Sequence, residues 1–391
     1  MKYHLPTFCL LFISLFACGG NTEDKDEKAV MPSASDDFQV YQIDVNGPKV
    51  SLFDLIEKVE IMRLEETEES LLSYVGQVID TGDEYIFNSG KEGDIYRYSK
   101  TGEYKTKINR KGEGPEEYFS TQSLWVEGDS IFVYTKSKKT VKQYLLNGDF
   151  VSSRDMPAGG TQIVPFGNGY AMDLNSTVVD DSLTFNVMLL DKDFARGPLY
   201  GPFTQYESFF SVSTSYNGLY PYKKDLAYMR ALSDTLFLVN EQGMRPLAYF
   251  DFGEDWLWKD TQLFNDSGAA SDAMQSRGLI WNLNAQVHPR WLLIDYITGF
   301  TADKTIIIDR STGAYRHIDY RMPDTDPASF VTIRWEGDRL FCSMPSSVLA
   351  DFIEQLGEER WEMRTGTTLE EIESSENPVL IWLKFKDQLP D

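Results

Sequence analysis

Carboxylates are the main chemical groups that the chain offers. It has 61 Asp and Glu residues but only three histidines, His4, His288 and His317. Glycoside cleavage needs two carboxyl groups at a defined separation, which the sequence alone does not fix. No His-Glu-x-x-His or His-x-Glu arrangement occurs, so we do not expect a zinc site built on histidine.

Other catalytic and cofactor motifs are absent from the sequence. There is no Gly-x-Ser-x-Gly segment for a nucleophilic serine and no Asp-x-Asp-x-Asp-Gly calcium loop. Gly112 and Gly114 lack the third glycine and the following helix of a dinucleotide-binding turn. We therefore assign no catalytic residue, no metal ligand and no cofactor. A looser Ca2+ site made of Asp side chains in a central channel is an open alternative that no motif supports.

Four tryptophans are the candidate contacts for a ligand or partner. Trp256, Trp258, Trp281 and Trp291 lie in and around residues 256–287, a stretch rich in good helix formers. Exposed indole rings could stack on sugar rings or cover a partner, whereas buried rings would pack this stretch on the rest of the fold. Both interpretations stay open at this stage.

The first residues have the pattern of an export signal. Lys2 precedes an apolar run from Leu5 to Ala17, which at 13 residues (17 − 5 + 1) is shorter than the roughly 20 that cross a bilayer. Leu15-Phe16-Ala17-Cys18 resembles a bacterial lipobox, in which the cysteine is acylated and becomes the new N-terminus. A plain cleaved signal with an incidental cysteine is the alternative. We expect a signal peptide at 1–17, lipidation of Cys18, and a flexible acidic tether at 18–36.

The tether also bears on localisation. Its cluster from Asn21 to Lys28 contains two Asp and two Glu residues and resembles the surface-export signal of Bacteroidota lipoproteins. We expect a lipid-anchored protein of the outer membrane that faces the cell surface, with the periplasmic face as the alternative.

The overall charge excludes one class of partner. The net charge is −24, and nucleic acid requires a basic face, so we expect no nucleic-acid partner. Cys342 is the one cysteine left after Cys9 leaves with the signal and Cys18 carries lipid, so no intrachain disulfide is expected.

Short strand-like runs fill residues 37–391. Runs rich in Tyr, Phe, Val and Ile recur in sets of four, separated by Gly-Asp, Asn-Gly and Thr-Gly turns. One set is 74–79, 85–88, 95–98 and 104–108, and the next is 123–126, 130–134, 141–145 and 150–154. Such a period is typical of an all-β propeller with four-stranded antiparallel blades. Six blades of about 59 residues fit best, seven are an alternative, and a pair of β-sandwiches is a further one.

One connection and three helical stretches interrupt this rhythm. Gly112, Gly114, Pro115, Glu117 and Tyr118 form a turn-rich segment that we expect to link one blade to the next. We expect small helical insertions within 256–287, over 347–356 and over 368–373.

Three segments resemble the six-bladed β-propeller lipoproteins of Bacteroidota, which are loosely similar to NHL-repeat propellers. The first is Arg110–Tyr118, similar to the family's Gly-x-Gly-Pro-x-Glu-Tyr/Phe connection. The others are Phe53–Glu65, similar to its opening strand, and Leu232–Val239, similar to its Ser-Asp-Thr strand. The resemblance implies a fold and no activity.

Taken together, these patterns favour a membrane-anchored, non-catalytic binding or scaffold module. Its partner would be a glycan, a peptide or an outer-membrane protein, and an uptake system is the setting that we expect. A carboxylate-dependent glycoside hydrolase or lyase is the alternative. We also expect residues 377–386 to share a sheet with 39–44 or 59–64, because propellers join their chain ends to remove exposed sheet edges.

Overall fold

The computed structural model describes most of the chain after residue 33. Its described residues are 34–89, 93–175, 178–179, 183–203, 218–299, 302–322, 327–364 and 367–390. The expected signal peptide, Cys18 and most of the tether lie outside these ranges. No helix in the described ranges is both long and apolar enough to span a membrane.

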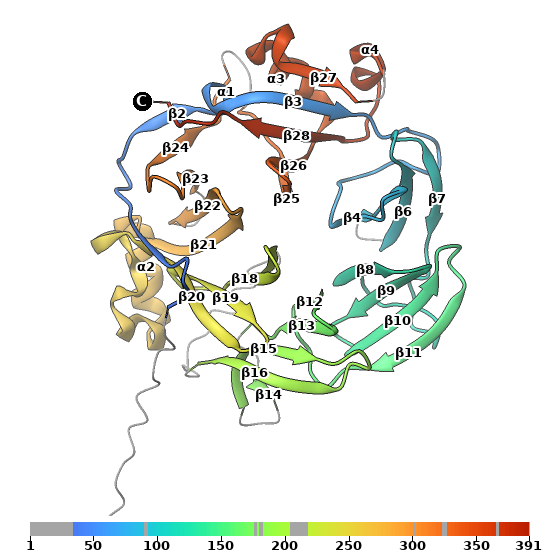
Figure 1. Cartoon of the computed structure of the whole chain (residues 1–391), viewed down its shortest axis with the longest axis horizontal. Helices are drawn as coiled ribbons and strands as arrows, with labels where there is room; N and C mark the ends of the chain where they lie inside the picture. Colours follow the sequence, from blue (N-terminus) through green and yellow to red (C-terminus); the bar gives the residue numbers. More distant parts are fainter. Residues whose placement is uncertain are drawn as a thin grey trace, which may run out of the picture. The chain divides into compact units, whose positions relative to one another are not determined.

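The described residues form a six-bladed β-propeller, as the repeat predicted (Figure 1). Each blade is one sheet, named here by its order along the chain. Blade one is β4 (Val78–Asp80), β5 (Glu84–Ser89), β6 (Asp94–Ser99) and β7 (Tyr104–Ile108). Blade two is β8 (Ser123–Glu127), β9 (Ser130–Thr135), β10 (Thr140–Leu145) and β11 (Phe150–Asp155). Blade three is β12 (Gln162–Phe166), β13 (Gly169–Asp173), β14 (Val178–Val179), β15 (Leu183–Leu190) and β16 (Arg196–Pro202).

The last three blades each gain a strand from elsewhere in the chain. Blade four is β17 (Leu219–Tyr222), β18 (Asp225–Met229), β19 (Thr235–Asn240), β20 (Gly243–Asp251) and β1 (Gln39–Gln42). Blade five is β21 (Ile280–Val287), β22 (Trp291–Thr298), β23 (Ala302–Asp309), β24 (Tyr315–Asp319) and β2 (Lys49–Ser51). Blade six is β25 (Val331–Glu336), β26 (Arg339–Met344), β28 (Val379–Phe385), β3 (Ile56–Met62) and β27 (Trp361–Met363).

The predicted closure of the ring is confirmed for one of the two suggested partners. β28 pairs antiparallel with β3, so that Leu380 faces Met62 and Ile381 faces Ile61. The other suggested partner, 39–44, contributes β1, which pairs in parallel with the outer strand of blade four. β2 pairs in parallel with the outer strand of blade five in the same way. The N-terminal segment therefore binds three consecutive blades before the first blade begins.

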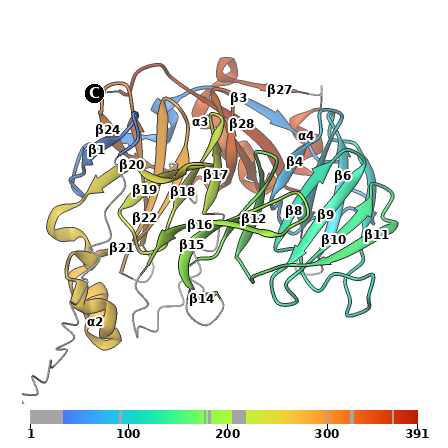
Figure 2. The same ribbon diagram turned by 60° about the horizontal axis from the view of Figure 1, so that its bottom comes forward.

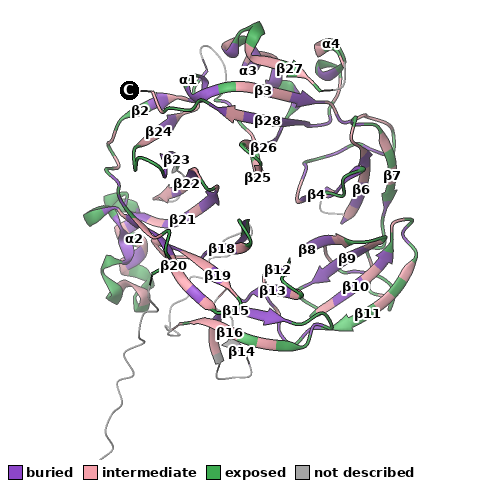
Figure 3. Cartoon of the chain, in the orientation of Figure 1, coloured by how far each residue is buried: buried purple, intermediate pink, exposed green. Residues whose placement is uncertain are grey.

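The core lies between neighbouring blades. Six hydrophobic clusters occur among the described residues, and each contains side chains from two adjacent blades. Between blades one and two, for example, Ile86, Ile95 and Ile108 pack with Leu124 and Ile131. Figure 3 shows this burial, with exposed residues along the outer strand β11 and on helix α2. Burial of this apolar area is the main favourable contribution to folding.

Polar side chains on the inner strands also join the blades. Gln162 accepts a hydrogen bond from Leu219 N and donates one to Leu219 O, at 2.9 and 3.0 Å. Ser123 Oγ accepts from Ile163 N at 2.9 Å, and Arg334 Nη1 donates to Val78 O. These contacts satisfy backbone groups that would otherwise be left unpaired in the ring's interior.

Helices occupy the connections, largely where predicted (Figure 2). After α1 (Leu52–Leu55), the insertion before blade five holds η1 (Gly253–Asp255), η2 (Leu257–Lys259), η3 (Thr261–Asn265) and α2 (Ser267–Arg277). Blade six carries η4 (Ser346–Val348), α3 (Leu349–Leu356), η5 (Glu358–Arg360) and α4 (Leu369–Glu373). Thr368 caps α4 with a capping box, as the sequence predicted. The expected helical stretch 256–287 was wrong at its C-terminal end, because residues 280–287 form the inner strand β21.

Candidate functional site

The four predicted tryptophans lie mostly inside the protein: three pack in the cluster between blades four and five, whereas Trp291 belongs to the cluster between blades five and six. Trp256, Trp258 and Trp291 are only 7%, 4% and 3% exposed, and Trp281 is half-buried in β21. Trp258 stacks on Phe264 and donates from Nε1 to Trp281 O at 2.7 Å. These contacts fit the packing interpretation, in which the rings hold the helical insertion on blades four and five. Their contact with a ligand stays a prediction.

The predicted inter-blade segment does connect blades one and two. Tyr118 is fully buried, and its hydroxyl donates to Gly93 O at 2.8 Å and accepts from Arg110 N at 3.2 Å. Glu117 turns back onto the segment, where Oε2 accepts from Gly114 N at 2.8 Å. A Cβ on Gly112 would lie 1.8 Å from the same oxygen, so a larger residue here would require the Glu117 carboxylate to move.

A cavity of about 530 Å³ lies directly beyond this segment. Three loops and Val179 of β14 form it, and the loops are the end of the connection, the β9–β10 turn, and the link from blade two to blade three. We call it the lysine cavity. It is lined by Phe119, Ser120, Gln122, Lys136, Lys139 and Gly159, among others.

The lysine cavity combines two positive charges with an exposed aromatic ring. In a chain of net charge −24, Lys136 and Lys139 have no ion pair or hydrogen-bonding partner for their side chains among the described residues. Phe119 is 46% exposed, and the ammonium of Lys138 lies 5.8 Å from its ring centre. Unpaired cations beside an aromatic face can hold an anionic ligand that also offers an apolar surface.

The walls of the lysine cavity are fixed by hydrogen bonds. Lys139 N donates to Lys136 O at 3.1 Å, which closes the β9–β10 turn, and Lys139 O accepts from Met156 N at 2.7 Å. Lys139 has a φ of 49°, a left-handed conformation that costs energy for a residue other than glycine. Gln122 Nε2 donates to Thr161 O at 2.9 Å across the opening between two blades. The turn therefore holds Lys139 in a strained position next to the cavity.

A buried carboxyl group lies behind the same wall. Asp173, at the end of β13, is 2% exposed and accepts hydrogen bonds from Thr161 Oγ1, Tyr228 Oη and Asn175 N at 3.1, 3.0 and 2.7 Å. Burial raises the pKa of Asp173 to about 6, although these hydrogen bonds and the charge of Lys136 act in the opposite direction. Because Tyr228 belongs to blade four, Asp173 joins blades three and four.

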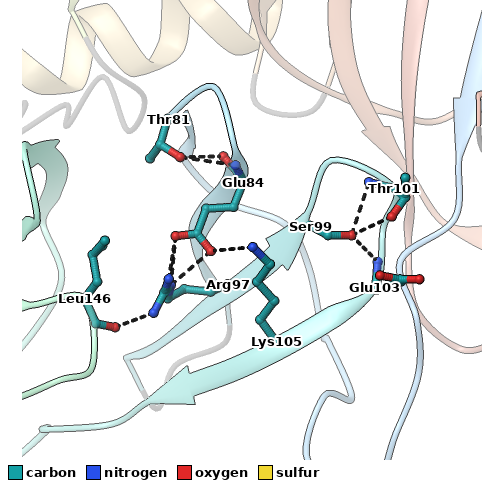
Figure 4. Close-up of polar contacts among 8 residues, drawn as sticks. All are labelled: Thr81, Glu84, Arg97, Ser99, Thr101, Glu103, Lys105 and Leu146. Atoms are coloured by element: carbon teal, nitrogen blue, oxygen red, sulfur yellow. Dashed lines mark hydrogen bonds and ion pairs between the residues drawn. The ribbon is translucent and has the colours of Figure 1, made fainter.

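Another buried carboxylate belongs to a structural ion pair (Figure 4). Glu84 is 4% exposed and binds Arg97 through both carboxylate oxygens, with Nη2 at 2.6 Å from Oε1. Lys105 Nζ lies 3.5 Å from Oε2, and Arg97 Nη1 donates to Leu146 O in blade two at 2.6 Å. Every oxygen of Glu84 is therefore engaged, and the pair ties blade one to blade two.

The histidines and acidic residues form no metal site in the part of the chain that the structure describes. His317 Nε2 donates to Asp44 O at 2.8 Å, its Nδ1 is hydrogen-bonded to Tyr296 Oη at 3.2 Å, and burial lowers its pKa. His288 packs on Trp335 with 4.9 Å between ring centres. Both histidines therefore contact other parts of the fold, His317 through hydrogen bonds and His288 through ring packing.

Sequence reasoning found the segment that leads to the lysine cavity but missed the cavity itself. Phe119 and Ser120 follow Tyr118 directly, whereas Lys136 and Gly159 approach only when blades two and three pack together. The run of three lysines from 136 to 139, interrupted by one serine in an acidic chain, was the available signal.

Comparison with known proteins identifies the family and the fold. A family model described as "Domain of unknown function (DUF4934)" matches residues 40–384. A search of curated proteins found no significant match. A solved structure of a candidate exported protein from Bacteroides fragilis NCTC 9343 has a TM-score of 0.67 at 15% identity, covering 90% of this chain and 100% of its own. A member of the DUF4221 family from Bacteroides vulgatus has a TM-score of 0.45 at 11% identity, covering 85% and 97%.

Proposed function

The chain belongs to the family described as Domain of unknown function (DUF4934), and we propose that it is an exported binding module that holds a small anionic ligand in the lysine cavity without turning it over. One observation carries this proposal. Two lysines without partners among the described residues lie beside an exposed aromatic ring, in a chain where acidic residues outnumber basic ones by 61 to 37. Both lysines are exposed, so an anionic ligand can approach their two charges from solvent.

The ligand class follows from the lining. Lys136 and Lys139 supply charge, Ser120 and Gln122 supply hydrogen-bonding groups, and Phe119 supplies a face on which a ring can stack. An acidic sugar such as a uronic acid offers a carboxylate, hydroxyls and an apolar ring face together. We therefore place glycans that carry carboxylates first among the ligands, ahead of neutral glycans.

Three observations support a binding role over catalysis. The buried carboxylates of Glu84 and Asp173 already accept two or more hydrogen bonds each, so neither is free to act on a substrate. Asp173 is also not among the residues that line the lysine cavity. Finally, the described residues that line the cavity include no carboxyl group, whereas the paired mechanism of glycosidases needs two.

The localisation of the protein is part of the same proposal. The lipobox-like segment ending at Cys18 supports a lipid anchor, and the acidic tether would let the propeller stand clear of the outer membrane. A similar fold occurs in the candidate exported protein of Bacteroides fragilis. Cys18→Ala should move the protein from the membrane fraction to the soluble fraction of cells. If the variant stays with the membrane, the anchor is elsewhere.

Binding to a panel of sugars tests the ligand proposal. Galacturonate and glucuronate should bind saturably in titration calorimetry, whereas galactose and glucose should bind at least tenfold more weakly. Lys139→Asn removes the charge and retains a residue type that tolerates the left-handed backbone, so it should weaken galacturonate binding about tenfold, or about 1.4 kcal/mol.

The matched control is Lys192→Gln, which removes an exposed lysine that lies 3.5 Å from Asp193. It should leave binding unchanged. Equal weakening by both variants would mean that net charge alone drives binding, which contradicts the proposal. Release of a product from any member of the panel, abolished by Asp173→Asn in a folded protein, would instead favour the hydrolase or lyase.

A further inference from the structure

A second cavity, of about 500 Å³, lies at the other end of the inner strands. The lysine cavity adjoins Gln122, just before β8, whereas this cavity adjoins Phe166, the last residue of β12. Its remaining walls are the β17–β18 and β19–β20 turns of blade four and the segment 35–37. We call it the blade-four cavity; Ser35, Lys224, Asp225, Glu241 and Arg245 are among its lining residues.

Charges of both signs line the blade-four cavity without neutralising one another. Among the described residues, the side chains of Lys224, Asp225, Glu241 and Arg245 form no ion pair or hydrogen bond. Asp37 also lines the cavity, but it differs from these four residues because it forms an ion pair with Lys223. Opposite charges that share one wall usually gain energy by pairing, so their separation keeps each available for another group.

A buried hydroxyl without a partner lies in the same wall. Ser35 is 7% exposed, and its Oγ atom has no hydrogen-bond partner among the residues that the structure describes. Buried polar atoms are nearly always satisfied in folded proteins, so an orphaned one at a cavity wall is evidence that something else supplies the partner. Ser35 is itself fixed, since its backbone N donates to Pro246 O at 3.0 Å.

From these observations we propose that the blade-four cavity binds a small zwitterion, namely a short peptide with free termini. The guanidinium of Arg245 can bind a carboxylate through two parallel hydrogen bonds, with Lys224 as a second cation. The carboxylates of Asp225 and Glu241 can bind the ammonium group. Phe166 and Leu238, which also line the cavity, can receive an apolar side chain.

The position of the blade-four cavity places a bound ligand between blade four and the segment 35–37. One wall is the segment 35–37, which is held by Lys223, by Pro246 O and by Arg310 Nη2, which donates to Asp37 O at 3.3 Å. The expected tether, residues 18–36, ends within this segment. A bound peptide would therefore contact both blade four and the first described residues of the chain, and should stabilise their association.

The test uses the full chain in detergent and the dipeptide Leu-Gly as the probe. Leu-Gly should bind saturably in titration calorimetry. Its N-acetylated form and its C-terminal amide should each bind at least tenfold more weakly, because each lacks one charge. Arg245→Gln should weaken Leu-Gly at least tenfold but should change the amide little, because the amide has no carboxylate to lose.

Arg321→Gln is the matched control, since Arg321 is 80% exposed and pairs only locally with Asp319. It should bind Leu-Gly normally, and all variants should show wild-type melting curves. Absence of saturable binding, or equal weakening of Leu-Gly and its amide by Arg245→Gln, would overturn the proposal. Lys139→Asn should leave Leu-Gly binding unchanged, so this result is independent of the lysine cavity.

Discussion

At the residue scale, burial and partners decide what each charged group does. Glu84 and Asp173 are both almost fully buried and hydrogen-bonded. Arg97, which binds Glu84, donates to Leu146 O of blade two, and Asp173 accepts from Tyr228 of blade four, so both carboxyl groups help to join neighbouring blades. Lys136 and Lys139 form no ion pair or side-chain hydrogen bond with the described residues, so an anion could bind to both.

The raised pKa of Asp173 predicts a specific pH dependence of stability. In the folded protein this pKa is about 6, against about 3.9 in an unfolded chain. Between pH 4 and 6 the folded state keeps a proton that the unfolded state has released, so the stability that this group contributes is present below pH 4 and is lost as the pH rises to 6. A shift of two units corresponds to about 3 kcal/mol.

Asp173→Asn should remove this dependence. Relative to wild type, the variant should gain up to about 3 kcal/mol in free energy of unfolding as the pH rises from 4 to 7, as measured by urea denaturation. Asp193→Asn, at an exposed position, is the control and should follow wild type. Parallel curves for wild type and Asp173→Asn would show that the carboxyl group does not titrate in this range.

At the scale of elements, the sequence predicted the strands set by local patterns and the closure of the ring, but it missed the other long-range strand pairings. Tyr, Val and Ile runs with turns between them identify the strands of blades one and two, because alternation and turn chemistry are properties of neighbouring residues. The parallel pairing of β1 with β20 and of β2 with β24 joins residues more than 200 positions apart, and no local pattern encodes it. The lysine cavity has no local sequence pattern either, because it forms only where three loops meet in the folded chain.

The pairing of β28 with β3 predicts that the C-terminal strand is needed for folding. β28 is an inner member of blade six, hydrogen-bonded on one side to β26 and on the other to β3. Deleting 379–385 would expose both neighbours and open the ring, so the truncated chain should show no cooperative unfolding transition in calorimetry. A chain that ends at Lys386 keeps β28 and should unfold cooperatively. Cooperative unfolding of the deletion variant with an unchanged midpoint would contradict the closure.

At the scale of the whole molecule, the fold provides a rigid ring with two separate cavities at opposite ends of its inner strands. Propeller blades position loops from distant parts of the chain, and loops are where recognition usually occurs. Trp256, Trp258 and Trp281 pack the helical insertion on blades four and five, whereas Trp291 lies in the cluster between blades five and six. The loops between blades one, two and three provide the cationic surface.

The most direct test of this account compares galacturonate with its methyl ester on two proteins. The ester keeps the sugar ring and its hydroxyls but has no negative charge. Wild type should bind galacturonate at least tenfold more tightly than the ester, and the double variant Lys136→Gln, Lys139→Asn should bind both equally weakly. If wild type does not distinguish the acid from the ester, or if the double variant still does, the lysine cavity is not the site of an anionic ligand.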